Sequence, residues 1–539
     1  MTDIGVISGY FLAVFGIALF FFFRRKRSSS GDETSSYFLG GRNLSWWVIG
    51  ASLFASNIGS EHLIGLAGAG AKGDFAAGQF EILAALMLLL LGWFFVPFYM
   101  KSGVYTMPEF LEKRYNSWAR GYLSWVSIIA YVLTKISVTI AAGGIVFTTL
   151  LGIGFWKGAL LIVIITGLYT VIGGLTVVVY TDLLQMVVLI AGALGLTYFG
   201  LHELGGWEGL VTQTEPQSLS LWRQMNHPDF PWTGILLGAP ILGVWYWCTD
   251  QFIVQRVLAA KNIDQARKGS IFGGFLKLLP PFLFVLPGVI AMALSTGDHS
   301  LVAFPSKASG GLDYDAALPA LTMSVLPTGF KGLVIAGLLA ALMSSLSSVF
   351  NSCSTLFTMD IYRKWRPKTS EKQLVYVGQI ATVALVLLGL AWIPFMQQLK
   401  GGLFQKLQSI QAYISPPIAV VFLIGILSKR VTAKAARVTL LAGAVIGLVR
   451  LGLELGQDHL SGALLYFTEI NFLHFAFFLF VICAVILLAS SRPEDAKPEI
   501  EINQITWNRS TLSVGGSRLN ILLSALLIVA VMVLWYVFK

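Results

Sequence analysis

Charged residues are scarce in this chain of 539 residues, where Asp, Glu, Lys and Arg together make up only 12%. Soluble domains usually carry about twice that share, roughly 25%. Apolar residues supply 56% before the 55 glycines are counted, and the mean hydropathy is +0.75. One globular core cannot bury so much apolar surface, which excludes a soluble enzyme and a disordered chain. The composition predicts a polytopic, all-α membrane protein.

Cysteine is also rare. Cys248, Cys353 and Cys483 are the whole set, and each lies inside an apolar run. This excludes a disulfide scaffold and favours small buried side chains. Residues 4–23 are apolar, with no basic residue before them and a basic run at 24–27. A signal peptide has the opposite order, so this segment is predicted to be a retained first span.

Fourteen apolar runs approach the ~20 residues that one crossing needs. They lie near residues 5–23, 45–71, 79–99, 121–150, 158–177, 182–201, 232–255, 270–294, 329–358, 373–397, 402–427, 437–455, 468–490 and 519–538. If the N-terminus is outside, external loops hold seven basic residues, and the spans and chain end hold four. The other 26 of the 37 Lys and Arg residues then lie on cytoplasmic connections. That asymmetry follows the positive-inside rule and places both termini outside.

Two groups of five spans have opposite orientations. The first covers residues 45–203 and the second 232–430, with an external loop at 204–231 between them. Residues 1–44 form the first span and a cytoplasmic loop, and 431–539 add three spans and a cytoplasmic connector at 491–518. Polar residues interrupt the leading span of each group, at 56–62 and at 245–251. Inverted repeats with broken helices are typical of secondary transporters, although both stretches could instead be interfacial helix ends.

Ionisable residues within spans are costly and often functional. Glu81 begins the third span, Lys277 lies about two turns into the eighth, and His62 adjoins the first interruption. Each has a simpler interpretation as well. Lys277 could extend to the cytoplasmic surface, Glu81 could be interfacial, and His62 could be a hydrogen-bonded core residue.

Hydroxyl groups gather in the ninth span, where Ser344, Ser347 and Ser348 share one helix face. They could replace the hydration shell of a hard cation, or they could simply allow close helix packing. Asp182 opens the sixth predicted span. It could cap that helix or supply the negative charge that a cation site needs.

Four motifs give the chain a family resemblance. Residues 54–62, 173–175 with 180–185, 245–251 and 357–362 resemble the sodium/solute symporters, specifically the sodium/glucose cotransporter branch. The resemblance extends from about residue 37 to 430. It implies a LeuT-like fold with a 5+5 inverted repeat among fourteen transmembrane helices, and transport by alternating access.

The resemblance also implies binding residues. The sugar site would use Asn57, His62, Glu81, Lys277, Gln408 and Trp247, with Tyr246 as the inner gate. A sodium site shared across the family would use Ala55, Ile58, Ala341, Ser344 and Ser345. A second sodium site, found in only some members, would use Asp182, Ser344, Ser347 and Ser348. The chain departs from sugar-transporting relatives at Gly243, Ala84 and Gln411, which bears on the choice of sugar.

The expected function is therefore sodium-coupled symport of a hexose of the glucose or galactose type, with two sodium ions per sugar. The expected partners are the sugar, sodium ions and the lipid bilayer of the plasma membrane, and no enzymatic activity or nucleic-acid binding is expected. Two alternatives stay open. One is transport of myo-inositol or another polyol, and the other is a sugar sensor without net transport. A sensor is disfavoured because no cytoplasmic signalling domain is evident.

Overall fold

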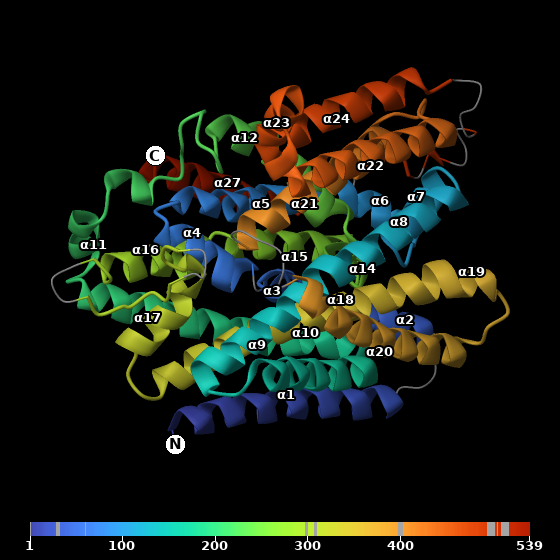
Figure 1. The fold of residues 1–539 in the computed structure, drawn as a ribbon. Helices are drawn as coiled ribbons and strands as arrows, with labels where there is room; N and C mark the ends of the chain where they lie inside the picture. The colour runs from blue at the N-terminus through green and yellow to red at the C-terminus, as the bar shows by residue number, and fades with distance from the viewer. Residues whose placement is uncertain are drawn as a thin grey trace.

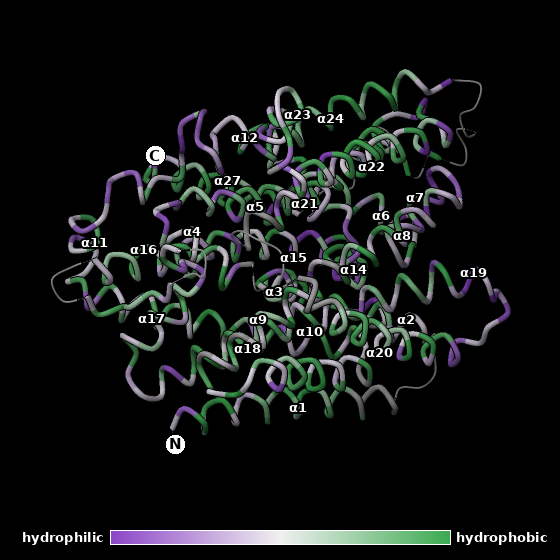
Figure 2. Tube along the Cα trace, viewed as in Figure 1, coloured by the Kyte–Doolittle hydropathy of each residue, from purple (hydrophilic) through white to green (hydrophobic). Residues whose placement is uncertain are grey.

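The helices of the protein lie side by side along one direction in the computed structural model (Figure 1). The structure describes residues 2–27, 33–59, 61–296, 300–306, 310–396, 403–492 and 517–539, together with 498, 502, 503 and 505–507. Hydrophobic residues fill the middle of the bundle, and hydrophilic residues gather at its two ends (Figure 2). Both termini lie at the same end (Figure 1). This distribution is that of a multi-pass membrane protein.

The α-helices of the N-terminal part are α1 (Thr2–Arg27), α2 (Glu33–Leu39), α3 (Trp46–Asn57), α4 (Ala67–Ala71), α5 (Gln79–Leu90), α6 (Val96–Ser102), α7 (Met107–Arg114), α8 (Ser117–Tyr131), α9 (Ser137–Leu151), α10 (Phe155–Glu203) and α11 (Trp207–Gln213). Next come α12 (Trp232–Leu237), α13 (Ala239–Gly243), α14 (Gln251–Leu258), α15 (Ile263–Leu276), α16 (Leu286–Ala293), α17 (Ala317–Val325) and α18 (Phe330–Thr355). The remainder are α19 (Arg363–Trp365), α20 (Glu371–Met396), α21 (Leu403–Leu427), α22 (Ala433–Leu455), α23 (Gly462–Glu469), α24 (Phe472–Ala489) and α27 (Arg518–Val537).

Wider π-helical turns extend several of these helices. They are η2 (Glu61–Leu66), η4 (Leu91–Phe95), η5 (Val132–Ile136), η7 (Val244–Thr249), η8 (Pro281–Val285) and η10 (Leu356–Tyr362). Short 3-10 turns are η1 (Gly40–Arg42), η3 (Phe75–Gly78), η6 (Pro216–Leu219), η9 (Tyr314–Ala316) and η11 (Gln457–His459). Such π-turns are frequent at functional sites, and η2 and η7 both lie beside the cavity described below.

Eleven helices among the described residues are long and apolar enough to cross a membrane. The second, fifth and seventh predicted spans are not among them. The second and seventh are interrupted, and the helical stretch of the fifth, Phe155–Val171, is shorter than the others. The count of fourteen crossings therefore stays a prediction. The three cysteines are free and buried, as expected from their apolar surroundings.

Both predicted interruptions are present. Helix α3 ends at Asn57, and Ile58 turns to an extended conformation (φ −71°, ψ 105°) before η2 begins. In the second interruption, Asp250 is extended (φ −78°, ψ 128°) between η7 and α14, and its side chain accepts a hydrogen bond from the Phe252 amide at 3.1 Å. These residues are thus not interfacial helix ends, because they are buried in the middle of the bundle.

The fifth and sixth predicted spans differ from expectation. Their two helices, which together make up α10, meet at a sharp break at Gly174 (φ 60°, ψ −159°), several residues before the predicted boundary and with almost no connection between them. Asp182 consequently lies well inside a helix, where it cannot cap an N-terminus. The interpretation of Asp182 as an N-cap is wrong, and its burial requires another explanation.

Gly174 is the position where the backbone of α10 depends on glycine. We expect Gly174→Ala to lower the free energy of unfolding by about 1–3 kcal/mol, because alanine is strained at this positive φ. Its Cβ would also lie 2.5 Å from the Tyr37 carbonyl oxygen. Thermal unfolding of the purified protein measures the loss. Gly167→Ala, in the same helix and with nothing within 4 Å of its Cβ, is the control and should not destabilise. Equal melting temperatures for the two variants would contradict this account.

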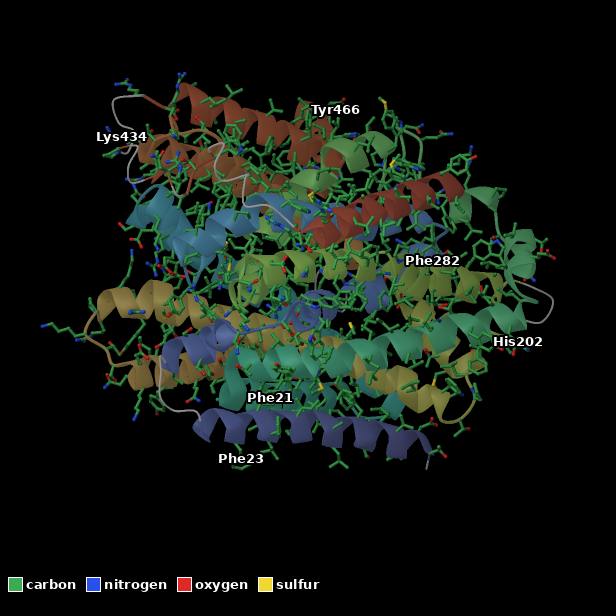
Figure 3. The ribbon with its side chains drawn as sticks, turned by 180° about the vertical axis from the view of Figure 1, so that it is seen from behind. Phe21, Phe23, His202, Phe282, Lys434 and Tyr466 are labelled. Atoms are coloured by element: carbon green, nitrogen blue, oxygen red, sulfur yellow. The ribbon has the colours of Figure 1, made fainter. Side chains whose placement is uncertain are left out.

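Helix α1 lies along the outside of the bundle against α10 and α18 (Figure 1). Phe21 points inward and stacks on Tyr180 of α10, with ring centroids 4.0 Å apart, whereas Phe23 points away from the bundle (Figure 3). Asp3 anchors the other end of α1 by accepting hydrogen bonds from the amides of Gly329 and Gly332 at 2.7 and 2.8 Å. The first predicted span is thus an integral part of the fold.

Helices α3 and α15 approach each other closely. A Cβ added to Gly50 would lie 2.8 Å from the Gly269 carbonyl oxygen, and one added to Gly269 would lie 2.7 Å from the Ile49 side chain. Small residues permit this backbone approach between membrane helices. It brings the end of α15, where Lys277 follows, beside the interruption of the second span.

Candidate functional site: a polar cavity between the interrupted helices

A cavity of about 60 Å³ lies where the two interrupted helices meet α5 and α21. Its lining residues are Asn57, His62, Phe80, Glu81, Leu83, Ala84, Met87, Ala239, Leu242, Gly243, Tyr246, Trp247, Leu407, Gln408 and Gln411. All the residues expected to bind sugar or to form the gate line it, with the exception of Lys277. Segments far apart in the sequence thus bring together nearly the whole predicted set.

Glu81 is the centre of the polar contacts beside the cavity. Its Oε1 lies 3.0 Å from Nε2 of His62, and its Oε2 accepts a hydrogen bond from the Lys277 ammonium. Lys277 also donates to Oδ1 of Asn57. Because the buried Glu81 carboxylate has these two partners, their interactions offset the cost of removing it from water.

Lys277 lies behind the cavity wall rather than on it. Its side chain is 0% exposed, and its ammonium contacts the cavity-lining residues Glu81 and Asn57. The alternative that Lys277 extends to the cytoplasmic surface is therefore wrong. Glu81 is likewise buried rather than interfacial. His62 lies within hydrogen-bonding distance of Glu81, as a core histidine would, and it also lines the cavity, so its role toward a ligand stays a prediction.

Tyr246 closes one side of the cavity. Its hydroxyl accepts hydrogen bonds from Nδ2 of Asn57 at 2.8 Å and from Nζ of Lys135 at 2.9 Å. The Lys135 ammonium also lies 4.5 Å from the Tyr246 ring centroid and 4.6 Å from that of Phe252. Sequence reasoning gave Lys135 no role. The available signal was a lysine in the middle of an apolar span, which is itself a reason to expect function.

The rest of the cavity wall is mostly apolar. The Lys277 ammonium lies 5.1 Å from the centroid of the Trp247 ring, which itself faces the cavity. Gln408 and Gln411 add amide groups from α21. All three positions that depart from the relatives, Gly243, Ala84 and Gln411, line the cavity. A ligand with several hydroxyls and one apolar face suits such a mixture of donors, acceptors and an aromatic ring.

The residues expected to form the shared sodium site lie on two adjacent helices. Ala55 and Ile58 are at the end of α3, and Ala341, Ser344 and Ser345 are on α18; all of these are buried. One turn away, the Ser348 hydroxyl donates to that of Ser56 at 3.0 Å, which joins the two helices. Carbonyl and hydroxyl oxygens are the ligands that a hard cation prefers.

Asp182 is the acceptor of three serine hydroxyls. Ser344 donates to its Oδ1 at 2.5 Å, while Ser52 and Ser56 donate to its Oδ2 at 2.5 and 3.0 Å. Of the other predicted ligands, Ser348 is connected to Asp182 through Ser56, whereas Ser347 donates to the Ser344 carbonyl at 3.0 Å. Of the predicted serine ligands, Ser344 thus bonds to Asp182 directly, and the other two direct hydroxyl contacts come from Ser52 and Ser56, which were not among the predicted ligands.

A helical membrane protein in which two interrupted helices meet at a buried polar cavity is a secondary transporter of the LeuT-like fold. The structure of a Na⁺-coupled sialic acid symporter in a substrate-bound outward-open state matches this fold with a TM-score of 0.78. The match covers 91% of this chain and 97% of that one at 22% identity.

The chain belongs to the sodium:solute symporter family, whose family model matches residues 37–447. Among its relatives, sodium/glucose cotransporter 1 of Ovis aries is 40% identical over 94% of this chain and 81% of its own length. Sodium/glucose cotransporter 4 of Danio rerio is also 40% identical, over 94% of this chain and 80% of its own length. These findings confirm the family resemblance. They also confirm a transporter rather than an enzyme, with sodium as the co-transported ion.

Proposed function

We propose that this protein couples the entry of a hexose of the glucose or galactose type to the entry of two sodium ions, by alternating access. Relatives named sodium/glucose cotransporters at 40% identity support the coupling and the sugar class. The observation that carries the proposal is the cavity that Glu81, His62, Asn57 and Gln408 line together with the aromatic residue Trp247. We assign the 45–203 and 232–430 segments to the two repeats that alternate around it.

A pyranose suits the chemistry of this cavity. Its hydroxyls both donate and accept, so they can bond to the Glu81 carboxylate and to the Gln408 amide, while its C–H face covers the Trp247 ring. These polar groups also pair with one another: Glu81 with His62, and Asn57 with Tyr246. A ligand that separates these pairs and has no hydroxyls of its own would leave the groups unpaired, at a cost of roughly 1–3 kcal/mol each. Hydroxyl number and placement therefore control selection.

We assign Tyr246 to the inner gate, because its hydroxyl bonds connect three helical segments across one side of the cavity. Asn57 contributes from the first interrupted helix and Lys135 from η5. Release of the sugar to the cytoplasm requires these two bonds to break or to move together with the gate.

Uptake into proteoliposomes tests the proposal. Labelled glucose, galactose, myo-inositol and a non-hydroxylated analogue are compared with and without an inward sodium gradient. Sodium-dependent uptake of a hexose above myo-inositol is the expected result. Uptake of myo-inositol above that of the hexoses would show that the substrate is a polyol and not a hexose. Binding of sugar and sodium without accumulation would instead indicate a sensor.

We propose that the N-terminus lies outside the cell. Labelling of introduced cysteines tests this orientation. A cysteine introduced at exposed Thr2 should react with an impermeant thiol reagent added to intact cells. A cysteine at exposed Ser370, in the connection between α19 and α20, should react only after permeabilisation, because that connection lies at the end of the bundle opposite the N-terminus (Figure 1). Labelling of the native cysteines should be low, because all three are buried. The reverse labelling pattern would invert the proposed topology.

A further inference from the structure

Arg256 occupies a place that the sequence does not reveal. The predicted seventh span ends just before it, which put it among the cytoplasmic basic residues, but the structure buries it completely on α14. Its Nε donates to the Ser52 and Ser56 hydroxyls at 3.2 and 3.0 Å, and its Nη1 donates to the Phe252 carbonyl. Its Nη2 has no hydrogen-bond partner among the described residues. A buried guanidinium keeps its charge and needs a negative partner nearby.

The same two hydroxyls connect Arg256 to Asp182. Each hydroxyl accepts from the guanidinium and donates its own proton to Oδ2 of Asp182. A serine can do both at once, since it has one donor and two acceptor positions. Two single-hydroxyl bridges therefore hold the opposite charges close together in an environment of low dielectric constant.

We propose that Arg256 is the resident counter-charge of Asp182, and that it sets the sodium affinity of the cation site to which Asp182 is assigned. This inference rests on the proposed function for that assignment. Without sodium, the guanidinium balances the carboxylate through Ser52 and Ser56. A sodium ion that binds at Asp182 meets a second positive charge at short range, which weakens its binding.

The position of Arg256 also connects this charge to the gate. Helix α14 follows directly after η7, which carries Tyr246. A displacement of α14 changes the distance between Arg256 and Asp182, and with it the sodium affinity. Arg256 thus acts as a positioning residue that couples the interrupted seventh span to the ion.

The test compares neutral and charged replacements of Arg256 in proteoliposomes and in purified protein. Arg256→Gln removes the charge and should lower the half-saturating sodium concentration by about fivefold to tenfold. Arg256→Lys keeps the charge and should stay near wild type. Arg267→Gln is the matched control, because Arg267 is also buried, lies 4.2 Å from the Trp93 ring centroid and donates to the Gly92 carbonyl. The rise in melting temperature on adding sodium, measured without sugar, should rank the sodium affinities of the variants in the same order as the uptake measurements.

Three results would overturn the inference: equal sodium affinity for the Gln and Lys variants, weaker binding in Arg256→Gln, or a shift in the Arg267 control of the same size. If Arg256→Gln does not fold, Ser52→Ala removes one of the two bridges and should still tighten sodium binding by about twofold to threefold; an unchanged affinity there overturns the inference. Failure of the proposed function is recognised separately, since the wild-type protein itself would then show no response to sodium.

Discussion

Replacing Lys277 by alanine is expected to lower the apparent sugar affinity by about 100-fold. The ammonium contacts both Glu81 and Asn57, and its removal leaves the buried Glu81 carboxylate bonded to His62 without its cationic partner. Leaving a polar group of the site without its partner costs roughly 1–3 kcal/mol, and about 1.4 kcal/mol corresponds to a tenfold change, so the loss at both Glu81 and Asn57 amounts to about 100-fold. The effect reaches the sugar through Glu81 and Asn57, because Lys277 itself lies behind the cavity wall.

Concentration-dependent uptake at saturating sodium measures this loss, and the melting temperature of each variant shows whether it is folded. Gln408→Ala removes a neutral amide from the cavity and should cost only about tenfold. Lys261→Ala removes an exposed lysine and serves as the control, with unchanged affinity expected. A folded Lys277→Ala protein with wild-type affinity would show that the Lys277–Glu81 pair is structural only.

The second large effect concerns the number of sodium ions. We expect two ions per sugar in the wild-type protein and one in Asp182→Asn. Each ion that enters down ~100 mV contributes ~2.3 kcal/mol, so one ion supports an accumulation of about 50-fold and two support about 2,000-fold. Asparagine keeps the volume and a hydrogen-bond acceptor but removes the charge that a dehydrated cation needs.

Reversal potentials across proteoliposomes give this ratio directly. Because Asp182 lies inside α10, a capping effect cannot account for a change in Asp182→Asn. Asp264→Asn is the matched control, since Asp264 pairs with Lys268 at 2.8 Å at the start of α15. The control should keep two ions per sugar. A ratio of one in the wild-type protein would contradict the prediction.

The sequence was sufficient for the class of fold and for the broken helices, because a polar stretch inside an apolar run is visible in one dimension. It was not sufficient for α10. Hydropathy shows that Tyr180, Thr181 and Asp182 are polar, but it does not distinguish a turn from a helix whose polar face meets other polar groups. The burial of Asp182 became evident only with Ser52 and Ser344 placed around it.

The candidate cavity was predicted residue by residue from family motifs, yet its internal pairing was not. Whether Lys277 reaches the surface or Glu81 depends on how closely α3 and α15 pack, which Gly50 and Gly269 determine in three dimensions. Arg256 was assigned to a loop because a basic residue at the end of an apolar run normally marks the membrane boundary. A buried arginine that balances a carboxylate also appears in the sequence as a basic residue at the end of an apolar run.

The mutual pairing of the cavity side chains has a consequence for the unloaded half of the transport cycle. A carrier that has released its cargo must return empty, and unpaired charges in a dry cavity would oppose that step. Here Glu81 is bonded to His62 and Lys277, and Tyr246 to Asn57 and Lys135. We therefore expect these side chains to compensate one another whenever the cavity holds no sugar, which favours the return step. Under the proposed assignment, the side chains that bind the sugar would thus also serve the return of the empty carrier.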